Sequence, residues 1–302
     1  MPNNSLQLTR LACGKSERAL PARMRENGWS VARAAGQLSS RPLGGDAIRS
    51  ANAEGRRVKM GGGVSKAILF DLDGTLLDNP MKVFRLALVQ ALVEYLGRYV
   101  PAQEALAALS KGVQAMDANV GTLHTNESVF VEAFCAAMEI EPDELKQHMQ
   151  AYFAHGFPQL AHLVHWLPEA RPLVTWAIQN AFQVVIATGM QTPLAAVEHR
   201  LAWAGVPVTD FAYAFITTWD NMHASKPHPA YYQEILTAIA RQPAECLMVG
   251  DDWEHDILPA TSIGIPSYWI VEPGQTPPAP SALVRGQGTL AEFFAWLRER
   301  AG

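Results

Sequence analysis

The sequence predicts an α/β fold, with a Rossmann-like, doubly wound parallel sheet as its core and an inserted all-helical cap domain. From about residue 169 onward, short apolar runs such as 183–188 alternate with helical segments, which is typical of strands buried in a parallel sheet. Between residues 80 and 165, four helical patterns follow one another without a strand, and such a stretch is unusual as a connection within one sheet. We therefore expect residues 65–79 and 166–302 to form the core and residues 80–165 to form the helical domain.

Composition indicates a globular protein outside the membrane. Of the 302 residues, 49% are hydrophobic, yet no uninterrupted apolar run approaches the roughly 18 residues of a membrane span. Cys13, Cys135 and Cys246 share no spacing typical of a metal site or a disulfide framework, so we expect reduced thiols in a cytoplasmic protein. The start of the chain lacks the apolar segment of a secretory signal, which favours the same compartment.

Charge is distributed unevenly along the chain. Residues 1–60 carry a net charge of +7, whereas residues 61–302 carry −12 and the whole chain −5. An acidic main part disfavours nucleic acid as a partner. It also gives no long-range attraction for anions, so any affinity for phosphate has to come from local groups and a metal. The sequence leaves the oligomeric state open.

The first 64 residues show no sustained periodicity and are rich in Arg, Ser, Gly, Ala and Asn. Three interpretations remain open: a disordered extension, an Arg-rich targeting leader, and a translation start at Met60 that would make the earlier residues non-native. The first and the third both predict a segment without packed structure.

The first strand of the core ends in two acids. The run Ala67–Phe70 shows no alternation, as expected for a strand buried on both faces, and Asp71, Asp73, Gly74 and Thr75 follow it. Two carboxylates at the end of a buried strand are costly to keep ionised unless a positive charge compensates them. Mg²⁺ prefers a few carboxylates together with waters and phosphate oxygens. The sequence therefore predicts a magnesium site at this strand end.

Periodicity and caps predict the remaining elements. After Pro80, the helical domain is expected to contain one helix starting at that residue and three more over about 102–115, 127–138 and 142–155. The later strands are expected at 183–188, 211–217, 246–249 and 266–270. Residues 272–288 are rich in Pro and Gly and predict a loop, and Thr289 and Glu292 then form a capping box for the last helix.

Polar residues suited to phosphate or metal follow the later strands as well. They are Thr188 and Gly189 after the second strand, Lys226 before a Pro-His-Pro segment, and Asp251, Asp252 and Asp256 after the fourth strand. The carboxyl ends of parallel strands meet at one edge of a sheet, so we expect these residues to converge there. A Thr hydroxyl and a Gly N–H can hold phosphoryl oxygens, and a Lys can neutralise their charge.

Taken in this order, the four segments resemble the four motifs of the haloacid dehalogenase-like hydrolase superfamily, over roughly residues 66–302. The resemblance implies a Mg²⁺-dependent phosphomonoester hydrolase that acts on a small, soluble phosphorylated metabolite through an aspartyl-phosphate intermediate. It also implies that the helical domain is the family's small cap, which closes over the site and sets specificity.

The resemblance assigns roles to the residues that handle the phosphoryl group. Asp71 is expected to be the nucleophile, and Asp73 the general acid that protonates the leaving oxygen and then the base that activates water. Thr188, Gly189 and Lys226 are expected to bind the phosphoryl oxygens.

The metal is expected to contact Asp71, Asp251 and the backbone carbonyl of Asp73. Asp252 is expected to assist through water, and Asp256 to hold the lysine or the metal-bound waters. Asp252 and Asp256 also fit a simpler interpretation as acids in the first turn of a helix.

Residues of the helical domain that contact substrate are harder to choose. Asn79, the polar loop 121–126, His162 and His165 are candidates, and each also fits an ordinary structural role. The Trp residues are interpreted as packing residues rather than as stacking platforms.

Three other functions remain open. A phosphomutase uses the same acids, and a non-catalytic phosphate-binding protein has the same fold without turnover. A haloalkanoate dehalogenase is disfavoured, because dehalogenases of this superfamily generally lack an acid two residues after the nucleophile, where this chain has Asp73.

Overall fold

The computed structural model describes residues 58–60, 63–121, 123–189, 191–279 and 281–300. Asn52–Gly302 forms one compact unit, which contains all of these residues. The extension predicted over residues 1–64 lies largely outside the described residues. Its end differs from that prediction, because β1 (Val58–Met60) and β2 (Gly63–Ser65) pair as antiparallel strands.

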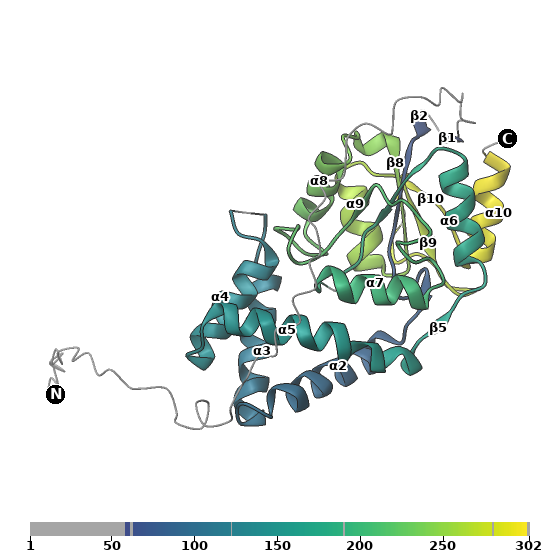
Figure 1. Ribbon diagram of the computed structural model, residues 1–302. Coiled ribbons are helices and arrows are strands. Elements are labelled where there is room, and N and C mark those ends of the chain that lie inside the picture. The colour runs from purple at the N-terminus through teal and green to yellow at the C-terminus, as the bar shows by residue number, and fades with distance from the viewer. Residues whose placement is uncertain (1–57, 61–62, 122, 190, 280, 301–302) are drawn as a thin grey trace, which may run out of the picture. The chain divides into compact units, whose positions relative to one another are not determined.

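A six-stranded parallel sheet forms the centre of this unit (Figure 1), which confirms the predicted α/β class. Its strands, in spatial order, are β10 (Val284–Gly288), β9 (Ser267–Ile270), β8 (Cys246–Gly250), β3 (Ala67–Phe70), β6 (Gln183–Ile186) and β7 (Phe215–Ile216). The chain builds outward from β3 first to one side and then to the other. The strand order therefore reverses beside β3. In open α/β sheets, ligands bind at such a reversal point, beyond the carboxyl ends of the strands.

Helices cover both faces of the sheet, because the strands bury side chains in both directions. Along β3, Ile68 and Phe70 pack into one apolar cluster and Ala67 and Leu69 into another. The first cluster includes residues from α6 (Ala170–Gln179), α7 (Leu194–Trp203) and α10 (Leu290–Arg300), and the second includes residues from α8 (Pro229–Ala238) and α9 (Leu258–Ser262). This arrangement explains why the strand sequences show no alternation.

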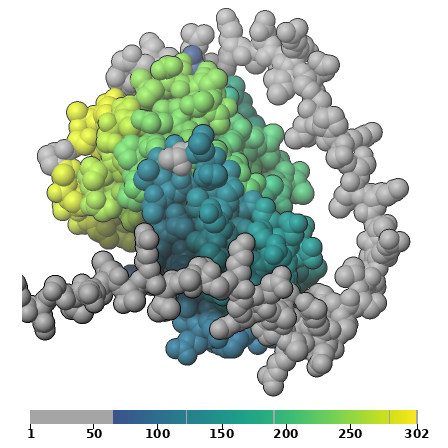
Figure 2. All heavy atoms as spheres, turned by 90° about the vertical axis from the view of Figure 1, so that its left-hand side faces the viewer, coloured from purple at the N-terminus to yellow at the C-terminus, as the bar shows by residue number. Residues whose placement is uncertain are grey.

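Helices follow β3 before the sheet resumes, as the sequence predicts. They are α2 (Met81–Leu96), α3 (Ala102–Asp117), α4 (Asn126–Met138), α5 (Pro142–His155) and a 3₁₀ turn, η1 (Phe157–Leu163). We call this segment, α2 to η1, the helical insert. At its base, β4 (Leu77–Asp78) and β5 (His165–Trp166) pair as a short antiparallel ribbon. Seen from the side of the insert, its blue and teal helices lie in front of the green and yellow core (Figure 2). Its division from the core as a separate domain stays a prediction.

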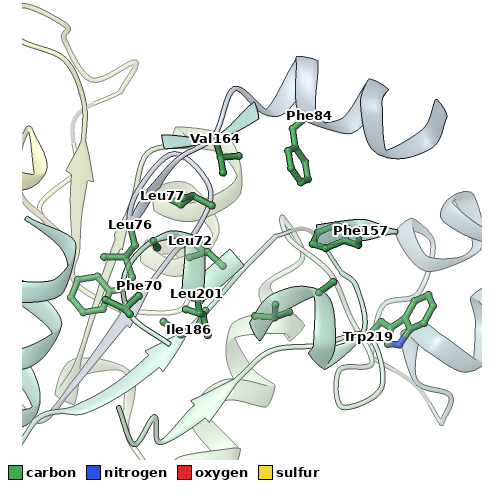
Figure 3. Close-up of a cluster of buried hydrophobic side chains, with 14 of the residues drawn as sticks. Phe70, Leu72, Leu76, Leu77, Phe84, Phe157, Val164, Ile186, Leu201 and Trp219 are labelled. Atoms are coloured by element: carbon green, nitrogen blue, oxygen red, sulfur yellow. The ribbon is translucent and has the colours of Figure 1, made fainter. Parts of the chain in front are cut away.

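One apolar cluster extends from the sheet into the insert. Phe70 and Leu201 lie in its sheet half, and Phe84 from α2 packs edge-to-face on Phe157, with ring centroids 6.0 Å apart. Trp219, from the loop after β7, lies at the insert end of this cluster (Figure 3). The insert and the core therefore share apolar packing.

Several boundaries differ from the predicted ones. Residues 284–288 were predicted to be part of a loop, but they form β10, which pairs with β9 at the edge of the sheet. The strand predicted at 211–217 shortens to Phe215–Ile216. The capping box of the last helix is confirmed, since Thr289 Oγ1 accepts from the N–H of Glu292 at 3.3 Å and Glu292 accepts from the N–H of Thr289 at 2.8 Å.

Two further findings concern thiols and membranes. Cys135 and Cys246 are buried free thiols, whereas Cys13 lies outside the described residues. None of the described helices combines the length and apolar character that crossing a membrane requires.

Candidate active site

Three neighbouring strands end at the same level and bring their polar residues together. Phe70 of β3 stands opposite Ile186 of β6 and Val249 of β8. The chain just beyond these three residues carries Asp71, Thr188 and Asp251. The convergence expected from the sequence is therefore present in the structure.

Lys226 joins two of the acids. Its Nζ donates to Oδ1 of Asp71 at 2.7 Å and to Oδ1 of Asp256 at 2.5 Å, and all three side chains are buried. Burial alone would lower the pKa of Lys226, but Asp256 and Asp71 outweigh it and raise that pKa well above its usual value. Lys226 is therefore a fixed positive charge against the carboxylate of Asp71.

The negative charge of the carboxylates at this sheet edge exceeds the positive charge near them. Ligand atoms of Asp71, Asp251 and Asp256 lie within 4.8 Å of one another, and Lys226 supplies one ammonium against the three carboxylates. Burial raises the pKa of Asp71 although Lys226 opposes the rise. A further positive charge beside Asp71 would therefore favour its ionised carboxylate.

Asp251 faces the open pocket, and its surroundings favour a cation there. Burial and the charge of Asp256 raise the pKa of Asp251 to about 7, although the charge of Lys226 and the hydrogen bond from Thr75 oppose the rise. Gly74, at φ +93°, approaches so closely that a Cβ would collide with the Asp251 carboxylate. An all-oxygen donor set with this excess of negative charge fits Mg²⁺.

Asp73 is held by a different set of groups. Its carboxylate accepts a hydrogen bond from Asn79 Nδ2 at 2.7 Å and from Thr188 Oγ1 at 3.3 Å. The guanidinium of Arg200, on α7, makes an ion pair with the same carboxylate and also donates to Oγ1 of Thr192 at 3.1 Å. Arg200 is fully buried, so the Asp73 carboxylate is fixed in orientation by groups outside the acid cluster.

Sequence reasoning missed Arg200, although a signal was present. On α7, Arg200 occupies the helix face of Ala196 and Val197, which are fully buried. A charged residue on an apolar helix stripe is rarely buried without a partner. This position therefore indicated a buried carboxylate partner, although several acids were equally suitable candidates.

The predicted phosphate-binding pair is divided. Gly189 lines the pocket. Thr188 is fully buried, and its hydroxyl donates to Asp73 and accepts from Arg200 at 3.1 Å. A contact between this hydroxyl and phosphate therefore requires it to turn away from Asp73.

The two acids predicted to assist the metal have distinct positions. Asp252 caps a π-helical turn, η3 (Trp253–Ile257), by accepting from the N–H groups of Glu254 at 2.9 Å and His255 at 3.0 Å. Although partial burial acts in the opposite direction, these hydrogen bonds lower the pKa of Asp252. Asp256 instead points back to Lys226, which donates to its Oδ1, and whether it holds the lysine or metal-bound waters during a reaction stays a prediction.

The candidates around the insert mostly lie away from the pocket. Asn79 contacts Asp73, whereas His162 bonds its own turn through the carbonyl of Gln159 and His165 lies 3.6 Å from Asp78 at the surface. Neither histidine lines the described pocket.

The polar loop 121–126, of which residue 122 lies outside the described residues, docks onto the core instead. The backbone N–H of Gly121 donates to the carbonyl of His223 at 2.7 Å, and the buried Asn126 donates through Nδ2 to the carbonyl of Ala224 at 3.1 Å. This loop therefore fixes the tip of the insert to the segment that precedes Lys226.

The acids open into a cavity of about 660 Å³ between the sheet edge and the insert. Asp71, Asp73 and Lys226 line one end of it. The insert supplies a wall that is mostly apolar, and Trp219 contributes to it from the core. Sequence reasoning interpreted Trp219 as a packing residue, and nothing pointed to the pocket, because a single aromatic residue in a loop fits packing equally well.

Two curated phosphatases are similar to this chain in sequence. A pyrophosphatase PpaX from Anoxybacillus flavithermus is 25% identical over 206 residues, which are 65% of this chain and 79% of that protein. A phosphoglycolate phosphatase from Vibrio vulnificus is 28% identical over 208 residues, covering 67% of this chain and 82% of the relative.

Among solved structures, a 2-haloacid dehalogenase from Pseudomonas syringae pv. Tomato is 20% identical with a TM-score of 0.53, covering 79% of this chain and all of that one (100%). This likeness concerns the fold alone.

A family model for haloacid dehalogenase-like hydrolases matches residues 65–264, the part of the chain that contains the sheet edge, the acid cluster and the insert. The chain belongs to the haloacid dehalogenase-like hydrolases.

Proposed function

We propose that the protein is a Mg²⁺-dependent phosphomonoester hydrolase that acts on a small phosphorylated metabolite. The observation that carries this proposal is the carboxylate of Asp71, held by Lys226 at 2.7 Å beside Asp251 and Asp256 at the end of an open pocket. The names of the relatives, a pyrophosphatase and a phosphoglycolate phosphatase, support phosphoryl transfer over other hydrolytic reactions.

In the first step, an oxygen of Asp71 attacks phosphorus and the bond from phosphorus to the ester oxygen breaks. Lys226 holds Asp71 in place and balances charge on the transferred phosphoryl group. Asp71 and Asp251 would hold Mg²⁺, which supplies electrostatic stabilisation of the phosphoryl oxygens when bound. The result is an aspartyl phosphate and a free alcohol.

Asp73 is proposed to move the protons. It donates one to the leaving alkoxide in the first step and takes one from the water that hydrolyses the aspartyl phosphate in the second. Asn79 and Arg200 orient this carboxyl group, so the proton donor does not depend on the pocket wall for its position. The presence of this acid also favours ester hydrolysis over dehalogenation.

The test is phosphate release from a broad panel of phosphomonoesters, with Mg²⁺ and with EDTA. Turnover should require Mg²⁺ and should disappear in Asp71→Asn. Asp143→Asn is the matched control, since Asp143 is an exposed acid on α5 outside the site. Folded, Mg²⁺-binding protein that releases no phosphate from any ester would favour a phosphomutase or a non-catalytic protein.

A further inference from the structure

The catalytic end of the pocket continues into an apolar groove of the helical insert. Along α2 the groove is lined by Met81, Arg85, Leu88, Val89 and Leu92, whose spacing places them on one helix face. From the first to the last of these residues the helix rises by about 16 Å. The cavity of about 660 Å³ lies within the range of roughly 300–1,000 Å³ that is common for small-molecule sites.

A second helix face lies across the groove. Leu109, Val113, Met116 and Asp117 of α3 contribute to the lining and again share one face. Val113 is 44% exposed, so the groove reaches solvent beside it. Apolar stripes of two adjacent helices normally fill the space between them, but here they line a cavity that is continuous with the acid cluster.

The groove offers few partners for polar groups. Of the twelve lining residues that come from the insert, ten are apolar, and Arg85 and Asp117 are the two charged ones. The backbone carbonyl of Asp117 already accepts from Nε2 of His228 at 3.2 Å. Along the insert wall, only Arg85 and Asp117 offer side-chain partners, so most hydroxyl groups of a sugar or a nucleoside would lose water there without gaining hydrogen bonds, which is unfavourable.

We propose that the substrate is a phosphomonoester whose alcohol carries a long apolar chain, with the phosphoryl group at the acid cluster and the chain in the groove between α2 and α3. This inference rests on the proposed function. It concerns the alkyl part of the substrate, which the insert would recognise. Because the groove runs along α2, we expect the alkyl chain to lie parallel to that helix.

The first experiment measures kcat/KM for a series of n-alkyl phosphates from ethyl to dodecyl, below their micelle concentrations and with Mg²⁺. Each added methylene should raise kcat/KM about fourfold until the groove is filled. Phosphorylated sugars of similar size should be poorer substrates than octyl phosphate. A kcat/KM that is independent of chain length, or highest for a sugar phosphate, overturns the proposal.

A second measurement separates this inference from the proposed function. Non-hydrolysable n-alkyl phosphonates are titrated calorimetrically into the Mg²⁺-loaded protein. If no ester is hydrolysed, the phosphatase proposal fails, and tightening of phosphonate binding with chain length still supports the apolar groove. Binding that does not depend on chain length overturns it.

A pair of variants on α3 tests the position of the chain. Val113→Asp places a charge in the groove, and Leu106→Asp places the same charge at a residue that is 48% exposed and does not line it. Val113→Asp should lower kcat/KM for decyl phosphate at least tenfold more than it lowers kcat/KM for ethyl phosphate. Leu106→Asp should change neither. Equal effects of the two variants on decyl phosphate would place the chain elsewhere and overturn the proposal.

Discussion

Arg200 and Asp73 form a buried ion pair, and replacing one of the two residues by an uncharged one should strongly destabilise the protein. Arg200 is fully buried and its partner nearly so, so Arg200→Met leaves a carboxylate without its counter-charge. Removing one partner of such a pair costs about 3–5 kcal/mol of unfolding free energy. For a unit of this size the melting temperature should fall by about 6–20 °C. Asp73→Asn should destabilise similarly, because it removes the negative charge that faces the buried guanidinium.

The double variant Arg200→Met/Asp73→Asn carries neither charge and should be more stable than the sum of the single effects predicts, by about 1–3 kcal/mol. The assay is urea unfolding in EDTA, followed by tryptophan fluorescence. Arg171 and Asp210 provide the matched control, since they form a 2.7 Å ion pair with side chains 52% and 41% exposed. The same cycle on that pair should give coupling of about 0–1 kcal/mol. Additive costs for Arg200 and Asp73, within about 0.5 kcal/mol, would refute the reasoning.

Four more outcomes are expected. On the proposed function, Lys226→Met should lower phosphate release about 100-fold or more, because the charge against the nucleophile is lost. In EDTA the melting temperature should fall as the pH rises from about 4 to about 7, because Asp251 has a pKa of about 7 in the folded state and near 3.8 when unfolded, so that only the folded state holds the proton in this window. Mg²⁺ should oppose this fall and bind more tightly as the pH rises, which calorimetry can measure. Gly250→Ala should cost about 1–3 kcal/mol in urea unfolding, because the new Cβ collides with the Asp256 carboxylate. Asn126→Ala should cost about 1–3 kcal/mol and speed amide exchange in residues 219–225.

Each of these outcomes has a contrary result. Full turnover in Lys226→Met would remove the lysine from the reaction. A melting temperature that rises with pH in EDTA would mean that the raised pKa of Asp251 does not dominate the pH dependence of stability. Wild-type stability of Gly250→Ala would require the Asp256 side chain to move freely, and unchanged exchange in Asn126→Ala would mean that this side chain does not hold the loop.

The sheet core was predictable because its evidence is local. The unbroken apolar run at Ala67–Phe70 shows burial on both faces, and the polar residues that follow each strand show where the strands end. Parallel pairing then places Asp71, Thr188 and Asp251 at one edge without any knowledge of side-chain contacts. β10 was missed because its residues, Val284–Gly288, include two glycines and a bulge against β9, and edge pairing rather than propensity makes them a strand.

The contacts around Asp73 were not predictable in the same way. Arg200 lies 127 positions away in sequence, and which of several acids it pairs with depends on how α7 packs against the sheet. The apolar groove had the same difficulty. The stripes on α2 and α3 are visible in the sequence, but periodicity does not distinguish two helix faces that pack together from two that enclose a space.

The attachment of the insert at two places constrains how the pocket is reached. The β4–β5 ribbon joins its base to the core, and hydrogen bonds from Gly121 and Asn126 join its tip to residues 223 and 224. A rigid swing of the insert away from the sheet would have to break the bonds at the tip, each of about 0.5–1.5 kcal/mol. Because Ala224 lies two residues before Lys226, the same swing would pull on the ammonium that holds Asp71. On the proposed function, opening the pocket would therefore also displace the carboxylate that is proposed to attack phosphorus.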